Sequence, residues 1–507
     1  MKSLWLPFFS GILLSLTLPA FGVWPLVWVA LVPLFIFASN KLISHRRLCV
    51  GVFLFAMPVA LTVVYPLMRV TGWWWFSGVS AFGTLALELK FACIIVLLGF
   101  WGALSVLPFV YMLRCFGKRC GAFLIVAVAW VAVEWFRSSY ALFGYSWGVI
   151  GYALLDTLYL KHLALFGGVY SLSFLVVLGN FSVVELIPSF QHKEQSADIK
   201  VMDMKYFLKR LRGIFIVLIE APYAYLGTWF FLCCFVSALF FGVYRERHLA
   251  TAIESCVQAP LRVAVVSSNI PTIESIGGGA YRNYRAKIMT AFKHGAELVV
   301  LPENTFPFFE LNEGDNSLEE YNMVHLEEQS ELYADFLALS RAHPTASIAV
   351  GLHTNSEKMR FNSLVIFTNG KPVAYYHKRK LVPFAEYAPL GLNMSIVMPF
   401  NAGVRKQYFS VSGVSASGLM CSEVGDTTIP LDNVDLIISP SNDSVFASPA
   451  ITLVHHRMAR MRALEADAYF IRASKGGISA IIKPNGMVQA QTQGDDVLIV
   501  DIAPKCK

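Results

Sequence analysis

Charged residues are scarce in this sequence. Asp, Glu, Lys and Arg make up 15% of its 507 residues, whereas ordinary soluble domains carry about 25%. Hydrophobic residues, by contrast, reach 56%. This balance excludes a disordered chain, a nucleic-acid-binding tail protein and an ordinary cytosolic enzyme, because each of these has a far more polar composition.

Paired cysteines are also lacking. The chain has nine cysteines and no Cys-x-x-Cys motif, and only Cys256, Cys421 and Cys506 lie in its more polar half. Three widely separated cysteines argue against a disulfide framework and against a zinc site. The remaining six lie in apolar segments, where a buried cysteine behaves as a small hydrophobic residue.

Charge and hydropathy divide the chain into two predicted domains. Residues 1–248 hold 19 Lys and Arg against 9 Asp and Glu, whereas residues 249–507 hold 22 against 25. A membrane span needs about 20 apolar residues, and the first domain contains seven candidate stretches. These are 4–20, 24–39, 49–68, 85–113, 121–137, 163–187 and 214–243. We therefore predict a transmembrane helical domain over 1–248, followed by a catalytic domain over 249–507.

Loop charge predicts the orientation of the spans. With the N-terminus inside, alternating sides place 13 Lys and Arg in inner segments and 5 in outer ones, and basic loops stay in the cytoplasm. An odd number of spans then delivers the second domain and the C-terminus to the outer side. The outer loop with Trp73, Trp74 and Trp75 fits either an interfacial aromatic belt or a vestibule through which acyl chains enter.

The second domain alternates short apolar strands with amphipathic helices, which indicates an α/β layered domain. Helices are expected at 280–295, 318–343 and 450–465. Strands are expected at 262–268, 297–301, 347–351, 362–368, 372–376, 417–421, 434–439, 468–473, 478–483 and 497–501. Asn485-Gly486 is a hairpin turn signal.

Three of these strand ends carry reactive side chains. Glu303 follows the strand at 297–301, Lys378 belongs to a run of cations after 372–376, and Cys421 ends the strand at 417–421. Alone, each residue has a structural interpretation, as a helix cap or ion-pair member, an exposed cationic face and a core cysteine respectively. Ligands of α/β sheets, however, bind beyond the carboxyl ends of strands.

Together these residues supply the parts of a covalent mechanism. Glu303 can accept the proton of Cys421, and Lys378 can stabilise a tetrahedral oxyanion. Glu386 can hold Lys378 charged and correctly aimed. A thiol at a strand end, close to backbone N–H groups, is expected to have a lowered pKa.

The order of these residues resembles a known family. Pro302-Glu303, Lys378 in Tyr-x-Lys-x-x-Leu-Val-Pro-Phe-x-Glu386-Tyr-x-Pro, and Cys421-x-Glu423 are similar to the Glu-Lys-Cys set of the nitrilase superfamily, the carbon–nitrogen hydrolases. The longer lysine string resembles its membrane branch, the apolipoprotein N-acyltransferase family. Further matches are Phe361-Asn362-Ser363, Ser441-Asn442-Asp443, Met461-Arg-Ala-Leu-Glu465, Glu134-Trp135-x-Arg137 and Gly144-Tyr-x-Trp147.

The resemblance implies an α+β membrane protein with an N-terminal multi-span α-helical bundle and a C-terminal nitrilase-like four-layer α-β-β-α sandwich. It implies a bacterial cytoplasmic (inner) membrane protein with its catalytic domain on the periplasmic side. The implied reaction is ping-pong: the cysteine takes an acyl chain from a membrane phospholipid as a thioester. The α-amine of a diacylglyceryl-modified apolipoprotein then attacks. No metal, soluble cofactor or nucleic acid is implied.

The resemblance also implies individual roles. Glu303 is the general base, Lys378 stabilises the oxyanion and Cys421 is the nucleophile. Glu386, Glu423 and Asn362 are supporting residues, and substrate contacts are expected from Trp147, Ser422 and Phe446.

Several positions depart from the family pattern. Ser422 stands where the family has Tyr, Ala385 where it has Gly, and Val445 and Ala447 replace Trp and Gly. These departures keep two alternatives open. One is a membrane-tethered amidase that transfers the acyl group to water, and the other is a non-catalytic paralogue that binds lipid or lipoprotein.

Overall fold

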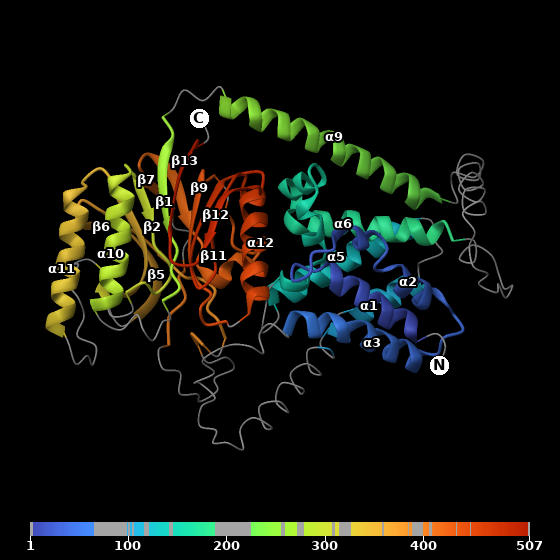
Figure 1. The fold of residues 1–507 in the computed structure, drawn as a ribbon. Helices are drawn as coiled ribbons and strands as arrows, with labels where there is room; N and C mark the ends of the chain where they lie inside the picture. The colour runs from blue at the N-terminus through green and yellow to red at the C-terminus, as the bar shows by residue number, and fades with distance from the viewer. Residues whose placement is uncertain are drawn as a thin grey trace, which may run out of the picture. The chain divides into compact units, whose positions relative to one another are not determined.

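The computed structural model describes two compact units, a helical unit drawn from residues 1–65, 84–137 and 147–244 and a sheet unit dominated by residues 245–507 (Figure 1). The described residues are 4–64, 99, 102–103, 106–115, 121–140, 146–187, 225–254, 259–270, 278–306, 310–313, 326–356, 359–383, 385–387, 399–404, 408–431, 433–446 and 448–504.

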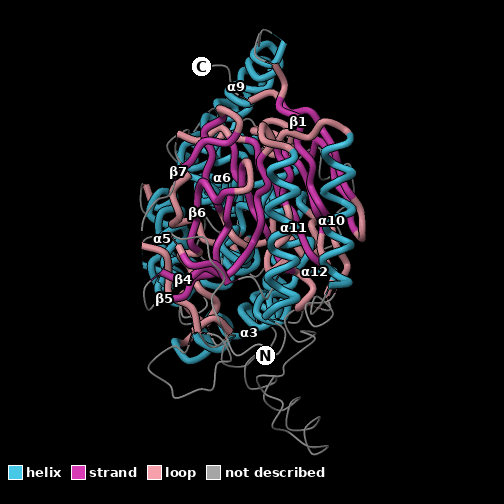
Figure 2. Tube along the Cα trace, turned by 90° about the vertical axis from the view of Figure 1, so that its left-hand side faces the viewer, coloured by secondary structure: helices cyan, strands magenta, loops and turns pink. Residues whose placement is uncertain are grey.

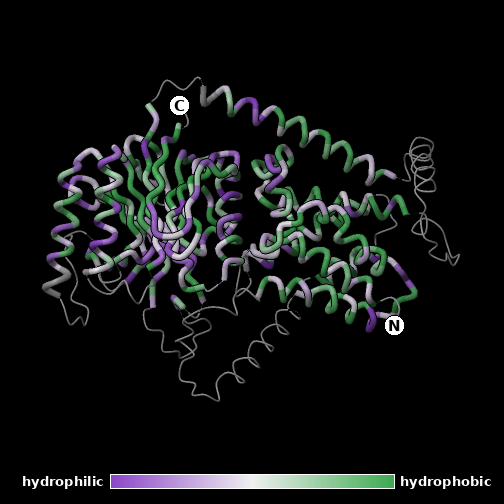
Figure 3. Tube along the Cα trace, in the orientation of Figure 1, coloured by the Kyte–Doolittle hydropathy of each residue, from purple (hydrophilic) through white to green (hydrophobic). Residues whose placement is uncertain are grey.

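The helical unit consists of apolar helices joined by short 3₁₀ segments, and Figure 3 shows that hydrophobic residues dominate it. Its α-helices are α1 (Trp5–Thr17), α2 (Val32–Ser39), α3 (His45–Val64), α5 (Ala122–Tyr140), α6 (Ala164–Glu185) and α9 (Leu226–Glu254). Among the described residues, α3, α5, α6 and α9 are long and apolar enough to cross a membrane. These four helices make the chain a membrane protein.

Four of the seven predicted spans, the third, fifth, sixth and seventh, coincide with these long helices. The first two form shorter apolar helices, Trp5–Thr17 and Trp24–Ser39. Most of the fourth, 85–113, lies outside the described residues, which include its helical end Val106–Cys115. The Trp73–Trp75 loop also lies outside them.

Polar and small residues fix the helices of this unit to one another. Asn180 of α6 is fully buried, and its Oδ1 accepts the N–H of Leu31 at 2.9 Å while its Nδ2 donates to the Val27 carbonyl at 2.7 Å. Gly11 of α1 lies so close to α3 that a Cβ would meet the Phe55 carbonyl oxygen at 2.2 Å. Such buried hydrogen bonds and close backbone approach are how apolar helices associate without a hydrophobic driving force.

The sheet unit contains two sheets. The first has seven strands in the order β13-β1-β2-β4-β5-β6, with β3 paired to β4, and the second has six in the order β12-β11-β10-β9-β8-β7. The strands of the first sheet are β1 (Leu261–Val266), β2 (Leu298–Val300), β3 (Glu310–Asn312), β4 (Ser347–Ser356), β5 (Met359–Thr368), β6 (Lys371–His377) and β13 (Val497–Ile502). Those of the second are β7 (Tyr408–Val411), β8 (Val414–Gly418), β9 (Leu436–Asn442), β10 (Tyr469–Lys475), β11 (Ile478–Ile482) and β12 (Val488–Gln493).

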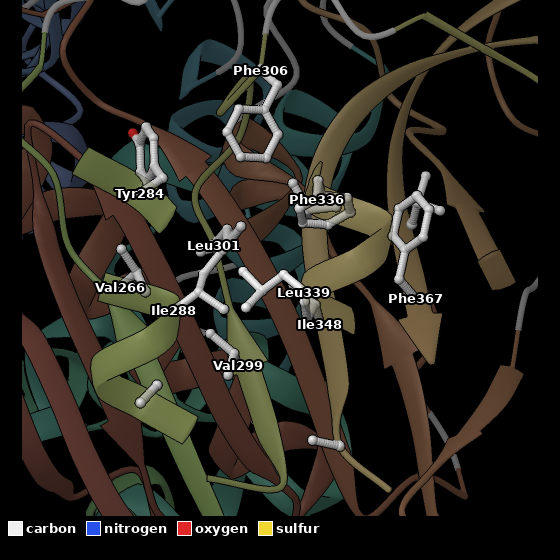
Figure 4. Packing of buried hydrophobic residues seen from close by; sticks show 14 of the residues in the cluster. Val266, Tyr284, Ile288, Val299, Leu301, Phe306, Phe336, Leu339, Ile348 and Phe367 are labelled. Atoms are coloured by element: carbon white, nitrogen blue, oxygen red, sulfur yellow. The ribbon is translucent and has the colours of Figure 1, made fainter. Parts of the chain in front are cut away.

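The two sheets pack face to face, with helices on both outer faces (Figure 2). Val263 and Ile366 of the first sheet share one buried cluster with Ile438 and Ile471 of the second. Helices α10 (Gly278–Lys293) and α11 (Leu326–Ala342) cover the other face of the first sheet through a second cluster (Figure 4). Helix α12 (Pro449–Ala466) packs on β10 and β11 of the second sheet. The predicted four-layer α-β-β-α sandwich is therefore confirmed.

Some details differ from the sequence-based prediction. The strands β3, β7 and β12 were not predicted, and the strand expected over 417–421 ends at Gly418. Residues 421–425 form a 3₁₀ turn instead. The predicted Asn485-Gly486 hairpin is confirmed, since it joins the antiparallel strands β11 and β12 and Gly486 has a φ of 72°. The domain boundary at residue 248 stays a prediction.

Candidate active site

Three strand ends of the sheet unit carry the predicted reactive residues. Glu303 follows β2, Lys378 follows β6 and Cys421 follows β8, and their exposed fractions are 6%, 1% and 8%. Burial of a carboxylate and an ammonium costs free energy unless the two are paired. The contacts of each residue therefore decide whether they form one site.

Lys378 lies between two carboxylates. Its Nζ is 2.9 Å from Oε1 of Glu386 and 3.6 Å from Oε1 of Glu303. Asn362 of β5 joins the same two carboxylates, because its Nδ2 donates to Glu303 Oε1 at 2.8 Å and to Glu386 Oε1 at 2.9 Å. The second oxygen of Glu386 accepts the N–H of Val382 at 2.7 Å. Lys378 of the cationic run therefore turns inward to Glu386, as the expected pairing of these two residues requires.

This network keeps Lys378 protonated. Burial by itself lowers the pKa of a lysine, but the carboxylates of Glu386 and Glu303 outweigh it and hold the pKa of Lys378 well above its usual value. The pocket therefore presents a permanent ammonium, which is the charge state that stabilises an oxyanion.

Cys421 begins the 3₁₀ turn Cys421–Gly425 in a left-handed conformation, with a φ of 45°. Residues other than Gly rarely adopt this region, and such strain clusters at functional sites. The backbone N–H of Asn442, at the end of the neighbouring strand β9, donates to the thiol. The sulfur is thereby held at the edge of the second sheet.

The predicted low pKa of this thiol is wrong. Burial raises the pKa of Cys421 well above its ordinary value, and the Glu303 carboxylate raises it further, whereas Lys378 and the Asn442 hydrogen bond lower it. Desolvation outweighs the backbone donor on which the expectation rested. Cys421 is thus a protonated thiol in the resting pocket, and a base must take its proton before it can attack.

Glu423 links the turn that carries Cys421 to the residues that follow Lys378. Its Oε1 accepts the N–H groups of Arg379 at 2.6 Å and Lys380 at 3.1 Å. Its Oε2 accepts the Met420 N–H at 2.7 Å and the Tyr376 hydroxyl at 3.0 Å. The residues that flank Lys378 and Cys421 therefore share one fully buried carboxylate.

The three predicted substrate contacts lie in different surroundings. Ser422 adjoins the nucleophile, and its buried Oγ has no hydrogen-bond partner among the described residues. Phe446 is half-buried and packs edge-on against His455. Trp147 belongs to the helical unit, where Arg137 donates to the adjacent Gly148 carbonyl at 2.8 Å and Glu134 accepts the Ile150 N–H at 2.9 Å. Their role in substrate binding stays a prediction, and Ala447 lies outside the described residues.

A buried charge network surrounds Asp443, which directly follows Asn442 at the end of β9. Asp443 pairs with Arg472 at 2.6 Å and with His455 at 3.0 Å, and all three side chains are almost fully buried. Burial raises the pKa of a carboxyl, but these two partners outweigh it and hold the pKa of Asp443 well below its usual range. The Ser-Asn-Asp motif was noted in the sequence, but this supporting role was not predicted.

Lys475 is a second residue that the sequence reasoning missed. It is fully buried at the end of β10, and its Nζ donates to the carbonyl of Asn304 at 2.7 Å. A lysine directly after a buried strand was the available signal, since lysines are almost never fully buried without a partner.

The arrangement suits acyl transfer through a thioester. It combines the protonated thiol of Cys421 with the carboxylate of Glu303 and the ammonium of Lys378. The carboxylate can accept a proton, and the ammonium is a charged donor for a developing oxyanion. Within the described residues, no group of three or more His, Cys, Asp or Glu side chains is placed to hold a metal ion.

Two family models match the chain. The carbon–nitrogen hydrolase model matches residues 242–506, which is more than half of the chain and includes all three reactive residues. The model of the apolipoprotein N-acyltransferase N-terminal domain matches residues 10–182.

Individual proteins are similar over most of the chain. An apolipoprotein N-acyltransferase of Geobacter metallireducens is 23% identical and covers 95% of this chain and 85% of its own length. Relatives of the same name from Azotobacter vinelandii and Aquifex aeolicus are each 26% identical, covering 94% and 72% of this chain and 84% and 72% of their own. A solved carbon–nitrogen hydrolase superfamily protein of Xanthomonas campestris is 17% identical, with a TM-score of 0.35, and covers 48% of this chain and 91% of its own.

Proposed function

The chain belongs to the carbon–nitrogen hydrolase family, and from this premise we propose that it is a membrane acyltransferase that N-acylates lipoproteins. The relatives named apolipoprotein N-acyltransferase, together with the matching N-terminal domain model, support this activity. The four long apolar helices supply the membrane anchor that such substrates require, because both acyl donor and acceptor are then held in the lipid surface.

The first half-reaction forms the thioester. Glu303 accepts the Cys421 proton as the sulfur attacks the ester carbonyl of a membrane phospholipid, and Lys378 stabilises the tetrahedral oxyanion. Collapse of the intermediate breaks the C–O bond, and Glu303 returns the proton to the leaving alkoxide. The products are an S-acyl Cys421 and a lysophospholipid. The contact of Lys378 Nζ with Glu303 Oε1 at 3.6 Å supports these roles.

The second half-reaction transfers the acyl chain to nitrogen. The neutral α-amine of a diacylglyceryl-modified cysteine attacks the thioester carbonyl, and its proton passes through Glu303 to the departing sulfur of Cys421. Asn362 and Glu386 keep Glu303 and Lys378 oriented throughout, as their distances of 2.8 and 2.9 Å support. Ser422, Phe446 and Trp147 are proposed to contact the lipid substrates.

The proposed location is the bacterial inner membrane, with the sheet unit on the periplasmic side. The excess of Lys and Arg in the inner segments of the predicted topology supports this orientation. Diacylglyceryl-modified acceptors are anchored by acyl chains, so a site on that side meets them in the outer leaflet.

The observation that carries this proposal is the buried Lys378–Glu303–Glu386 network assembled with a protonated Cys421 thiol. The test incubates the purified full-length protein with phospholipid carrying labelled acyl chains. Acid quenching and mass spectrometry then locate the label. The expected result is an acyl group on the Cys421 peptide that neutral hydroxylamine removes, followed by its transfer to the α-amine of an added diacylglyceryl-cysteine peptide.

Two variants make this test decisive. C421A should lose the label entirely, whereas C49A, which removes an exposed cysteine of the helical unit, should keep it. Label retained in C421A would refute the covalent mechanism. Release of labelled fatty acid in place of transfer to the peptide would identify a membrane-tethered amidase.

A further inference from the structure

Lys475 is a second buried lysine beside the proposed active site, and the mechanism above does not use it. Its side chain is fully buried, and it is the last residue of β10. Burying an ammonium costs free energy unless it gains a compensating interaction. A buried lysine therefore needs a specific reason for its position.

The Lys475 side chain reaches the turn that carries Glu303. Its Nζ donates to the carbonyl of Asn304 at 2.7 Å, and Asn304 directly follows Glu303. Asn304 has a φ of 53°, in the left-handed region that Asn adopts more readily than most residues other than Gly. A charged donor on this carbonyl stabilises the turn, because hydrogen bonds from charged groups are stronger than neutral ones.

The Lys475 backbone is fixed from both sides. It pairs with Asn442 of β9, whose N–H donates to the Cys421 thiol, and it forms an isolated bridge with Ser268. The Asp443 N–H donates to its carbonyl at 2.8 Å. Lys475 thus stands on the same strand end as the thiol donor, while its side chain holds the turn of the base.

The pKa of Lys475 also reflects an interaction with the Glu303 carboxylate. Burial lowers the pKa of Lys475 to about 8, and the Glu303 carboxylate partly offsets that effect. The lysine is therefore mostly charged at neutral pH. Glu303 also interacts with Lys378 and with the buried His353, and with the thiol of Cys421.

Three carboxylates act on the single ammonium of Lys378, namely those of Glu303, Glu386 and the buried Glu423. Asp443 also acts on the Cys421 thiol, but Arg472 and His455 already pair with Asp443. A second cation beside Glu303 therefore reduces the negative charge that opposes both proton removal from the thiol and a developing oxyanion.

We propose that Lys475 is a positioning residue for Glu303, which fixes the turn after this base and places a positive charge beside its carboxylate. The inference rests on the proposed roles of Glu303 and Cys421. It extends them to a fourth strand end, that of β10.

The test measures how fast iodoacetamide alkylates Cys421 in the full-length protein as a function of pH, with the Cys421 peptide followed by mass spectrometry. The variants are K475M, K475Q and K475R. In K475M and K475Q, Cys421 should be alkylated about tenfold more slowly at each pH below its pKa, because loss of a nearby opposite charge moves a pKa by about one unit or more. K475R should keep the wild-type rate.

The variants separate charge from structure. Gln keeps a hydrogen-bond donor but loses the charge, so a purely structural role would leave the K475Q rate close to that of the wild type. K287M is the matched control, because Lys287 also donates to a backbone carbonyl, that of Ser267 at 2.9 Å, and pairs with Asp495. Its alkylation rate should equal that of the wild type.

Wild-type alkylation rates in K475M and K475Q would overturn the proposal, as would an equal loss of rate in K287M. If K475M fails to fold, the comparison of K475Q with K475R decides. Alkylation needs no acyl donor, so a protein that fails to acylate lipoproteins would refute the proposed function and still give a readable profile for Lys475.

Discussion

Replacing Glu386 by Gln tests the network around the ammonium of Lys378. Oε1 of Glu386 accepts from Lys378 Nζ and Asn362 Nδ2, and Oε2 accepts from the Val382 N–H. A glutamine must point its NH₂ group at one of these donors. The Lys378 and Glu386 side chains are 2% and 11% exposed, and breaking a pair this deeply buried costs about 3–5 kcal/mol.

The E386Q variant should also acylate Cys421 roughly 100-fold more slowly, because it misaims Lys378 and loss of one oxyanion donor costs about 100- to 1000-fold in rate. The assay is single-turnover formation of the labelled thioester, quenched in acid. A parallel thermal unfolding experiment reports stability, so that loss of the fold is not mistaken for loss of chemistry.

The chain offers a closely matched control for E386Q. Glu465 pairs with Arg462 of the same helix, α12, at 2.8 Å, and the side chains of Arg462 and Glu465 are 4% and 11% exposed. Helix α12 packs against the Cys421–Gly425 turn, so E465Q breaks a buried pair beside the site without removing a partner of Lys378. E465Q should lower the unfolding temperature to a similar extent and leave the acylation rate within about twofold. Equal loss of acylation in both variants would refute the argument that Glu386 acts through Lys378, and so would a wild-type rate in E386Q.

Two further predictions concern β4. G351A should slow thioester formation at least tenfold, because its new Cβ would lie 2.6 Å from Cα of Glu303 and small displacements of a reacting group are costly. The control G279A, whose Cβ meets nothing within 4 Å, should form the thioester at the wild-type rate. Equal rates in the two variants would contradict the prediction. Burial lowers the pKa of His353 from 6.5 to about 4, so the unfolded chain binds a proton that the folded one excludes, and stability falls as pH drops through this window. Between pH 6.5 and 5 this amounts to about 2 kcal/mol, and urea unfolding of H353Q should show a shallower loss than wild type; identical slopes would be the contrary result.

Much of the site could be predicted because its residues follow apolar strands. Glu303, Lys378 and Cys421 each come directly after such a run, and strand ends are where sheets bind ligands. The four-layer architecture followed from the resemblance, and the alternating strands and helices agreed with it. The short polar strand β12 escaped prediction because Val488 is its one large apolar residue and its side chains remain half exposed or exposed.

Other features depend on contacts that a linear sequence does not contain. The pKa of Cys421 rises because of how deeply the thiol is buried, and strand-end position alone suggested the opposite. Lys475 meets Asn304 across 171 positions of the chain. Only the parallel pairing of β9 with β10 brings this lysine beside the pocket.

The Glu423 carboxylate has a consequence for inhibitor design. One group receives hydrogen bonds from Tyr376, Arg379, Lys380 and Met420, so the segments that carry Lys378 and Cys421 cannot separate without breaking some of them. An electrophilic inhibitor that spreads these segments apart must therefore compensate for the lost hydrogen bonds. Small electrophiles should for this reason outperform bulky rigid ones.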